Sequence, residues 1–254
     1  METTDKKADE EKKENEKQAD LSSENSLKLG IMLSGGKDSL YAAYLMKKKG
    51  NELSCALTMK SKNLSSYMFH TPNISMTKLQ SEAMGIPFIE KETIGEKEKE
   101  LEDLHSLIEK AKYTYGLHGI ITGAIFSDYQ RERIEKICKQ LELEVYSPLW
   151  HMNQEEEMRN VINAGFEIIL SSIACYGLGK NWLGKIITHN DINQLVNLNN
   201  KCGINIAGEG GEFESLVLDC PLFKKKIQIE EKEIISEDEN TANLVIKKAI
   251  LTNK

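Results

Sequence analysis

The stretch from Leu29 to Leu45 constrains the fold of this chain more than any other part of its sequence. An apolar run, Leu29–Leu33, leads into Ser34-Gly35-Gly36-Lys37-Asp38-Ser39, and a periodic segment, Ser39–Lys49, follows and ends at Gly50. The apolar run predicts a buried strand and the periodic segment a helix. Glycines between a strand and a helix permit a tight turn whose N–H groups, together with the positive end of the helix, can hold an anion.

Strand-like and helix-like segments alternate along the rest of the chain. Short β-branched or alternating runs predict strands, and apolar residues at helical spacing predict helices. Strands are expected at Leu53–Met59, Phe88–Glu92, Gly119–Ala124, Glu167–Ala174 and Phe213–Leu218, with extended stretches near Ile227–Ile235 and Asn243–Leu251; helices are expected at Thr77–Met84, around Leu101–Tyr115, and at Asp128–Leu141, Glu155–Ala164 and Asp191–Leu198. This alternation predicts an α/β fold with a parallel sheet and βαβ crossovers.

Four regions are expected along the chain. Residues 1–26 carry nine acidic residues and five lysines and contain almost nothing to bury, so we expect a disordered charged tail. The parallel sheet is expected in residues 27–125 and a second, smaller α/β domain in residues 126–225. Residues 226–254 are expected to form a C-terminal extended segment.

Composition limits the class of protein. No apolar run approaches the roughly 20 residues that cross a bilayer, and the N-terminus lacks the apolar stretch of a secretory signal, so we expect a cytoplasmic protein with no membrane partner. The net charge of −7 argues against a nucleic-acid partner, because binding phosphates needs a basic face. The five cysteines stand singly, without metal-ligand spacing, and most are expected to be buried free thiols.

The side chains of the glycine-rich loop suit a phosphate. Lys37 supplies a mobile positive charge, and Asp38 is suited to hold Mg²⁺ beside the phosphates. The hydroxyls of Ser34 and Ser39 can donate to phosphate oxygens, and Ser39 is also placed to cap the helix. The spacing is neither that of a Walker A loop nor that of a dinucleotide G-x-G-x-x-G motif. The alternative is an ordinary glycine turn with solvated charges.

In its strand–loop–helix context, the hexapeptide SGGKDS resembles the PP-loop of the ATP pyrophosphatase superfamily. The resemblance implies a Rossmann-like sheet that binds ATP with Mg²⁺, cleavage between the α- and β-phosphates, and transfer of AMP to a substrate oxygen. It assigns ATP binding to residues 34–39, and adenine to the end of the next strand, at Thr58 and Met59. Gly123 and Ser127, at the carboxyl end of the sheet, are further nucleotide candidates, although Ser127 could instead cap the next helix.

Six further segments resemble the diphthine–ammonia ligase family, in that family's order, so that the resemblance extends from about Leu29 to Phe223. They are Ser66–His70 with Pro72-Asn73, Gly95–Glu98, Gly123–Arg131, Pro148–Trp150, Trp182–Gly184 and Gly208–Ser215. The family uses ATP and ammonium to amidate diphthine, a modified histidine of translation elongation factor 2, to diphthamide. The chain resembles the short, archaeal-type form, since the larger eukaryotic forms carry further C-terminal domains, although its acidic tail departs from that pattern.

The stretch Gly208–Ser215 is the strongest candidate for binding the substrate. Its glycines include Gly210 and Gly211 and permit close backbone approach, while Glu209, Glu212 and Glu214 bring three carboxylates within six residues. Like charges repel, so a cationic partner is expected, and the resemblance implies two: the trimethylammonium group of diphthine and ammonium itself. The alternative is an exposed acidic turn.

The expected catalytic residues are Lys37 and Asp38 at the phosphates, together with Glu209 and Glu212; Glu209, Glu212 or His70 would deprotonate ammonium. The diphthine carboxylate would attack the α-phosphorus to give an acyl-adenylate, from which ammonia displaces AMP. Two alternatives stay open: a PP-loop ligase that adenylates another carboxylate or a tRNA base, and an ATP-binding module without catalysis.

Three side chains outside these stretches are substrate-binding candidates: His70, Tyr129 and Arg131. His70 could instead lie on the surface, and Arg131 could pair with acidic residues of its own helix or reach the ATP phosphates. Trp150 and Trp182 are expected to pack in the core or between domains rather than to contact substrate.

Overall fold

The protein is described here by a computed structural model covering residues 26–62, 73–125 and 128–254. Its elements are β1 (Lys28–Met32), α2 (Lys37–Lys48), β2 (Glu52–Ser61), α3 (Met76–Met84), β3 (Phe88–Thr93), α4 (Lys97–Tyr115), β4 (Gly119–Ile121), α5 (Asp128–Gln140), β5 (Glu144–Tyr146), α6 (Gln154–Asn163), β6 (Glu167–Ala174), the short 3₁₀ helix η1 (Lys180–Trp182), α7 (His189–Cys202), β7 (Phe213–Asp219), β8 (Lys226–Ser236) and β9 (Thr241–Thr252). The expected tail lies almost wholly outside the described residues.

The first sheet is parallel, with strand order β3-β2-β1-β4-β5. Its two faces follow from the alternation of side chains along a strand. In β2, Cys55, Leu57 and Met59 pack with α4 and α5, whereas Ala56 points to the opposite face, where α2 and α3 lie. The order changes direction between β1 and β4, and open α/β sheets bind ligands beyond the carboxyl ends of the strands at such a point.

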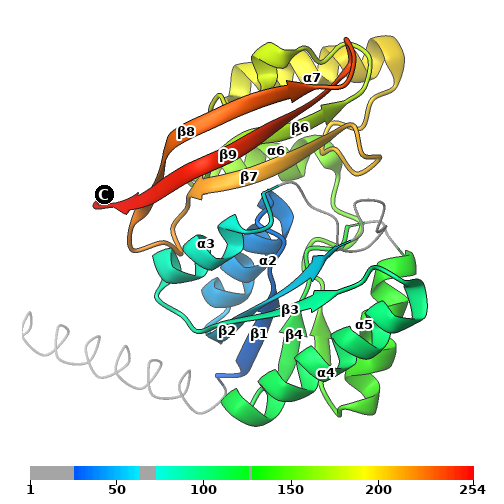
Figure 1. The fold of residues 1–254 in the computed structure, drawn as a ribbon, viewed down its shortest axis with the longest axis vertical. Helices are drawn as coiled ribbons and strands as arrows, with labels where there is room; N and C mark the ends of the chain where they lie inside the picture. Colours follow the sequence, from blue (N-terminus) through cyan, green and yellow to red (C-terminus); the bar gives the residue numbers. More distant parts are fainter. Residues whose placement is uncertain (1–25, 63–72, 126–127) are drawn as a thin grey trace, which may run out of the picture.

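The second sheet is antiparallel, with order β7-β6-β9-β8. Figure 1 shows it above the first sheet, with α2 and α3 between the two sheets and α6 and α7 behind the second. One hydrophobic core includes Ile31 of β1, Leu40 of α2, Leu170 of β6 and Leu195 of α7. The two sheets therefore share a core, and the fold is the expected α/β Rossmann-like sheet with a second, smaller domain.

The regions divide differently from the expected boundaries. The first sheet continues past residue 125 through α5 to β5, a strand that the sequence did not predict because it is three residues long and begins with an exposed glutamate. Residues 226–254 are not a separate segment, since β8 and β9 pair with each other and β9 pairs with β6. The two long strands were predicted correctly as extended, but their partners are set by tertiary structure.

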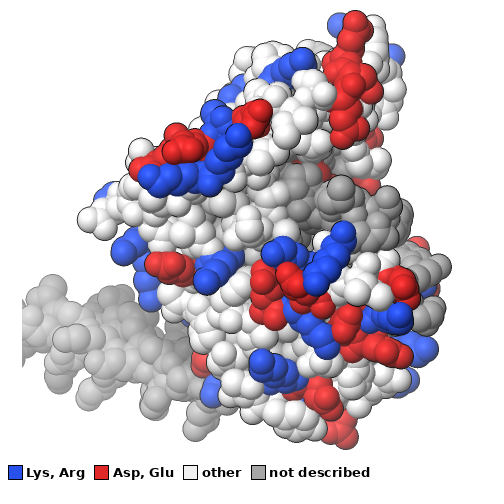
Figure 2. Space-filling model, viewed as in Figure 1, with Lys and Arg blue, Asp and Glu red and all other residues white. Residues whose placement is uncertain are grey.

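Charges of both signs are mixed on the face of the molecule seen in Figure 2. On the β8–β9 ribbon, Lys247 pairs with Glu233, and Lys248 with Glu230. Such exposed pairs contribute little stability each, but they keep an edge strand charged and soluble. In the described part of the chain, no helix combines the length and apolarity that crossing a membrane requires.

Candidate active site

The loop between β1 and α2 closes around the hydroxyl of Ser39. Ser39 Oγ accepts hydrogen bonds from the backbone N–H and the hydroxyl of Ser34, at 3.4 and 3.2 Å, and donates to the Gly36 carbonyl at 3.2 Å. Gly35 has φ +91°, a conformation that glycine adopts without strain. The helix begins at Lys37, so Ser39 lies inside its first turn and does not cap it; the N-cap residue is Gly36, which has no side chain that could cap α2.

This loop is fastened to the second sheet. The Gly35 carbonyl accepts hydrogen bonds from the Val217 backbone N–H at 3.1 Å and from Gln80 Nε2 at 2.9 Å. Gln80 Nε2 also donates to the Val217 carbonyl, at 2.9 Å, and the backbone N–H of Lys37 donates to Ser215 Oγ at 3.1 Å. Because Ser215 and Val217 belong to β7, the second sheet fixes the position of the loop.

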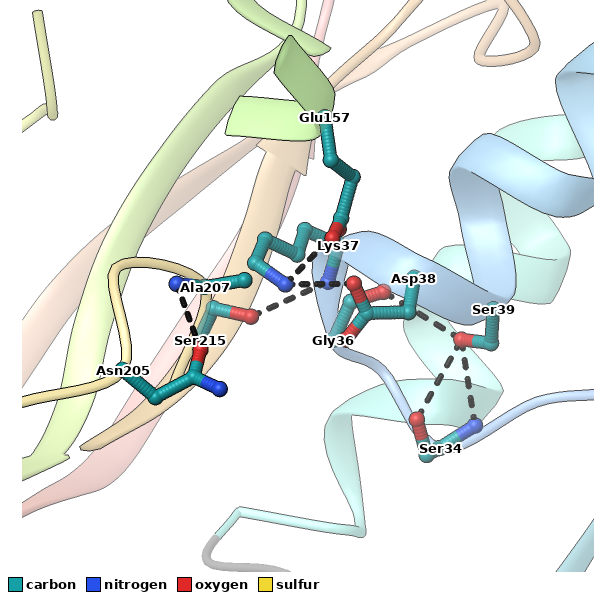
Figure 3. A network of polar contacts seen from close by, with 9 residues as sticks. All are labelled: Ser34, Gly36, Lys37, Asp38, Ser39, Glu157, Asn205, Ala207 and Ser215. Atoms are coloured by element: carbon teal, nitrogen blue, oxygen red, sulfur yellow. Dashed lines mark hydrogen bonds and ion pairs between the residues drawn. The ribbon is translucent and has the colours of Figure 1, made fainter. Parts of the chain in front are cut away.

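The Lys37 side chain is 1% exposed and is surrounded by carboxylates. Its ammonium pairs with Asp38 and with Glu157 Oε1, the latter at 3.0 Å (Figure 3). Burial alone would lower the pKa of Lys37, but Asp38, Glu157 and Glu209 together raise it above the ordinary value. Lys37 therefore carries a permanent positive charge at the start of α2.

Glu157 is the functional residue that sequence reasoning missed. It is fully buried, and among the described residues its Oε2 has no hydrogen-bond partner. Burial raises the pKa of Glu157, and Asp38 adds to this rise while Lys37 opposes it. In the sequence, Glu157 is one of three consecutive glutamates at the start of a predicted helix, where the helix dipole favours acidic residues in general. The available signal was its position beside Met158 and four residues before Val161, both buried on the inner face of α6.

Glu209 and Glu214 also interact electrostatically with this lysine and with Asp38. The surrounding protein raises the pKa of each to about 7, and the nearby Asp38 carboxylate adds to the rise, while Lys37 opposes it. The sequence placed Glu209 and Glu214 in a candidate substrate stretch, and the structure brings both into the electrostatic field of Lys37 and Asp38. Asp38 and Glu157 pair with the ammonium, and Glu209 and Glu214 add two further carboxyl groups in its electrostatic field.

Glu212 has a different environment from the other two acids of its stretch. Its Oε1 accepts from the Asn205 backbone N–H at 2.8 Å, and its Oε2 accepts from the Gly210 N–H at 2.9 Å. Gly208 and Gly211 adopt φ values of +82° and +84°, and the Gly211 N–H donates to the Gly208 carbonyl at 3.1 Å. The Glu212 carboxylate thus holds together the loop that carries Glu209.

The predicted adenine residues lie at the carboxyl end of β2. Thr58 is fully buried and its Oγ1 donates to the Leu33 carbonyl at 2.8 Å, while the Met59 side chain lies in the core under α4. The described pairing of β1 with β2 ends at Met32 and Leu57, whereas β2 continues to pair with β3 as far as Ser61. Beyond Leu57, the backbone groups of β2 on the side that faces β1 therefore pair with no described strand.

Gly123 packs directly against the first turn of α2. A Cβ at this position would lie 2.6 Å from the Ser39 backbone nitrogen and 2.7 Å from the Asp38 carbonyl carbon, so no larger residue fits without movement. This contact holds the segment after β4 against the start of α2, and it accounts for a glycine at position 123 without any role in binding nucleotide.

Other predicted residues are occupied elsewhere or not described. Arg131 Nε pairs with Glu135 of its own helix at 2.6 Å, and the guanidinium lies 4.4 Å from the ring centre of Trp150, which is half-buried. Trp182 is buried, with the Lys185 ammonium 4.2 Å from its ring centre. His70 and Ser127 lie outside the described residues, and Tyr129 is placed only as part of α5.

Within the described ranges, no three histidine, cysteine or acidic side chains are grouped so that protein alone could hold a metal ion. Cys55, Cys138 and Cys220 are buried, and burial raises the pKa of each thiol to about 12, so these three are inert, as expected. Cys175 is partly buried and Cys202 exposed.

Comparison with known proteins covers nearly the whole described chain. The diphthamide synthase N-terminal domain family matches residues 27–145, and the diphthamide synthase C-terminal domain family matches residues 153–252. A solved structure, of a predicted subunit of tRNA methyltransferase from Methanocaldococcus jannaschii, is similar with a TM-score of 0.41 and 14% identity, over 77% of this chain and 98% of that one.

Curated relatives carry the name diphthine–ammonia ligase. The Homo sapiens protein is 33% identical over 82% of this chain and 85% of its own length, and the Danio rerio protein is 35% identical over 80% and 87%. The Schizosaccharomyces pombe relative is 31% identical over 88% of this chain, and the match covers 39% of its own length. The chain belongs to the diphthine–ammonia ligase family, a family of ligases.

Proposed function

We propose that this protein uses ATP and ammonium to amidate diphthine on translation elongation factor 2 to diphthamide, in the cytoplasm. One observation carries the proposal beyond family membership. The lysine of a PP-loop and the acidic stretch that contains Glu209 and Glu214 come from different domains, and they meet in one site. A phosphate-binding loop beside a group of acidic side chains suits a reaction between a nucleotide and cationic partners.

ATP fits the loop by its backbone and its side chains. The N-cap residue of α2, Gly36, has no side chain to occupy the first-turn N–H groups. Ser215 accepts from the Lys37 N–H, and the N–H groups that follow it, together with the positive helix dipole, favour an anion. Ser34 and Ser39 present hydroxyls there, and Lys37 presents its permanent charge. Adenine would lie against the backbone edge of β2 beyond Leu57, at Thr58 and Met59, where no described strand competes for its hydrogen bonds.

Mg²⁺ fits the donor chemistry of the site. Asp38 and Glu157 pair with the Lys37 ammonium, and hard divalent cations prefer carboxylate and phosphate oxygens. Asp38, beside the loop, is the residue that would hold the ion, and the phosphates of ATP would supply other ligands. Bound there, the ion would neutralise phosphate charge.

The reaction needs alignment more than a covalent enzyme intermediate. A diphthine carboxylate oxygen attacks the α-phosphorus, the bond to pyrophosphate breaks, and an acyl-adenylate forms. Ammonia then attacks the acyl carbon and the bond to AMP breaks. Lys37 stabilises negative charge that develops on the phosphates, and positioning of the reactants by the two domains supplies up to about 7–11 kcal/mol of barrier reduction.

The acidic stretch is proposed to act on ammonium, the nitrogen donor of the reaction. Glu209 is the proposed base for ammonium, because a carboxylate with a pKa near neutrality can accept a proton at working pH. Glu209 and Glu214 also attract the trimethylammonium group of diphthine. Glu212, expected among the catalytic residues, is proposed instead to shape the loop together with Gly210 and Gly211, since backbone N–H groups occupy its oxygens.

The test is an assay of the purified protein with ATP, Mg²⁺, ammonium and elongation factor 2 that carries diphthine. We expect AMP and pyrophosphate to appear only with all components, together with the small mass change of the factor on amidation. The matched control is Asp38→Ala, which should abolish AMP release. AMP release with tRNA or a small carboxylic acid, and none with the factor, would show that the acceptor is another molecule.

A further inference from the structure

Lys37 is held at both of its ends by the second domain. Its backbone N–H donates to Ser215 Oγ of β7 at 3.1 Å, and its ammonium donates to Glu157 Oε1 of α6 at 3.0 Å. Figure 3 shows Glu157 reaching toward the lysine from one side and Ser215 from another. Asp38, the next residue in α2, is the other carboxylate beside the ammonium.

The contact between Lys37 and Glu157 is buried on both sides. Lys37 is 1% exposed and Glu157 is 0% exposed. A buried carboxylate is costly unless it is paired, and Glu157 Oε2 has no hydrogen-bond partner among the described residues. Its pairing with Lys37 therefore compensates for burying the Glu157 charge, and Glu157 belongs to α6, outside the loop.

We propose that Glu157 is a positioning residue, which fixes the direction of the Lys37 ammonium before ATP binds. This inference rests on the proposed function in one respect, that Lys37 meets the phosphates of ATP. A lysine on a flexible stem loses rotamer freedom when it binds phosphate, and a partner that already orders it removes part of that cost from the binding step. The ordering favours turnover, whereas the negative charge that the same carboxylate carries when ionised opposes binding of the phosphates.

The two effects separate in two variants. Glu157→Gln keeps an oxygen that can accept from Lys37 but loses the charge, so we expect tighter ATP binding than in the unaltered protein, with turnover within a few-fold. Glu157→Met loses the acceptor as well, so we expect turnover at saturating ATP to fall by about 10²-fold, the size of effect that small misplacement of a reacting group produces. Glu156→Gln, a neighbouring exposed acid, is the control and should change neither quantity.

ATP affinity is measured by calorimetry without any acceptor, turnover by AMP release in the complete assay, and folding by the melting temperature. A merely structural role would lower the melting temperature and leave the affinity and turnover of the folded fraction unchanged. The inference is overturned if folded Glu157→Gln and Glu157→Met bind ATP as the unaltered protein does and match its turnover. A change in ATP affinity between the variants, with no amidation of the factor by any of them, would instead support the role of Glu157 and reject the proposed acceptor.

Discussion

At the scale of single residues, Glu209 and Glu212 show that neighbouring acids in one motif have separate tasks. Both carboxylate oxygens of Glu212 accept from backbone N–H groups of its own loop, whereas Glu209 interacts electrostatically with Asp38 and Lys37. The sequence motif shows a glutamate at both positions and does not distinguish them, because the difference lies in the contacts that each side chain makes. Mutation separates a residue that shapes the site from one that acts in it.

Glu212→Ala is expected to lower the free energy of unfolding by about 1–2 kcal/mol, since two charge-assisted hydrogen bonds to the loop are lost. Glu209→Gln is expected to leave that free energy unchanged and to lower turnover by about 10²-fold or more, as loss of a general base does. Urea unfolding and the AMP-release assay measure the two quantities. A stable Glu212→Ala with normal loop structure, or a fully active Glu209→Gln, contradicts the corresponding assignment.

At the scale of elements, α7 depends on a capping box at its N-terminus. Thr188 Oγ1 accepts from the Asp191 N–H at 3.4 Å, and Asp191 Oδ2 accepts from the Thr188 N–H at 2.9 Å, while Lys185 donates to Asp191 Oδ1 at 2.7 Å. Burial alone would raise the pKa of Asp191, but the hydrogen bonds from Lys185 and Thr188 lower it below the ordinary 3.8. The ionised carboxylate is therefore the form that stabilises the helix.

Asp191→Asn should reduce the free energy of unfolding by about 1–2 kcal/mol at neutral pH. A carboxyl whose pKa is depressed by folding contributes stability above its unfolded pKa and loses it as pH falls through the folded value. The difference between Asp191→Asn and the unaltered protein should accordingly be constant from pH 7 down to about 5 and shrink below about pH 4. Urea unfolding at a series of pH values measures it, and a difference that stays the same down to about pH 2 would show that the charge does not matter here.

At the scale of the whole molecule, the sequence predicted what is local and left open what is set by packing. The PP-loop, the helices from α2 to α7 and the long strands follow from periodicity and from residues such as Gly35 within one segment. The short β5, the pairing of β9 with β6 and the contact of Glu157 with Lys37 depend on segments more than twenty residues apart in the chain. The site itself is of this second kind, because its loop and its acids belong to different domains.

A core shared by two domains should make them unfold together. Phe166, just before β6, is 3% exposed and packs edge-on against Tyr41 of α2, with ring centres 5.7 Å apart and an interplanar angle of 85°, and also against Tyr44 at 5.8 Å. Phe166→Ala should lower the free energy of unfolding by about 3–5 kcal/mol through the lost transfer energy and the cavity. Tyr113→Ala, at a position 74% exposed, is the control and should stay close to the unaltered protein.

Fluorescence reports the two domains separately when one tryptophan is replaced at a time. Trp182 lies in the second domain, whereas Trp150 follows β5 of the first sheet and contacts Arg131 of α5. In Trp182→Phe and Trp150→Phe backgrounds, we expect Phe166→Ala to shift both urea midpoints by the same amount, because α2 and α3 are buried against both sheets. If only the second-domain midpoint moves, the domains are stabilised independently, and their contact at the PP-loop would have to be maintained by the Lys37, Gly35 and Gln80 hydrogen bonds alone.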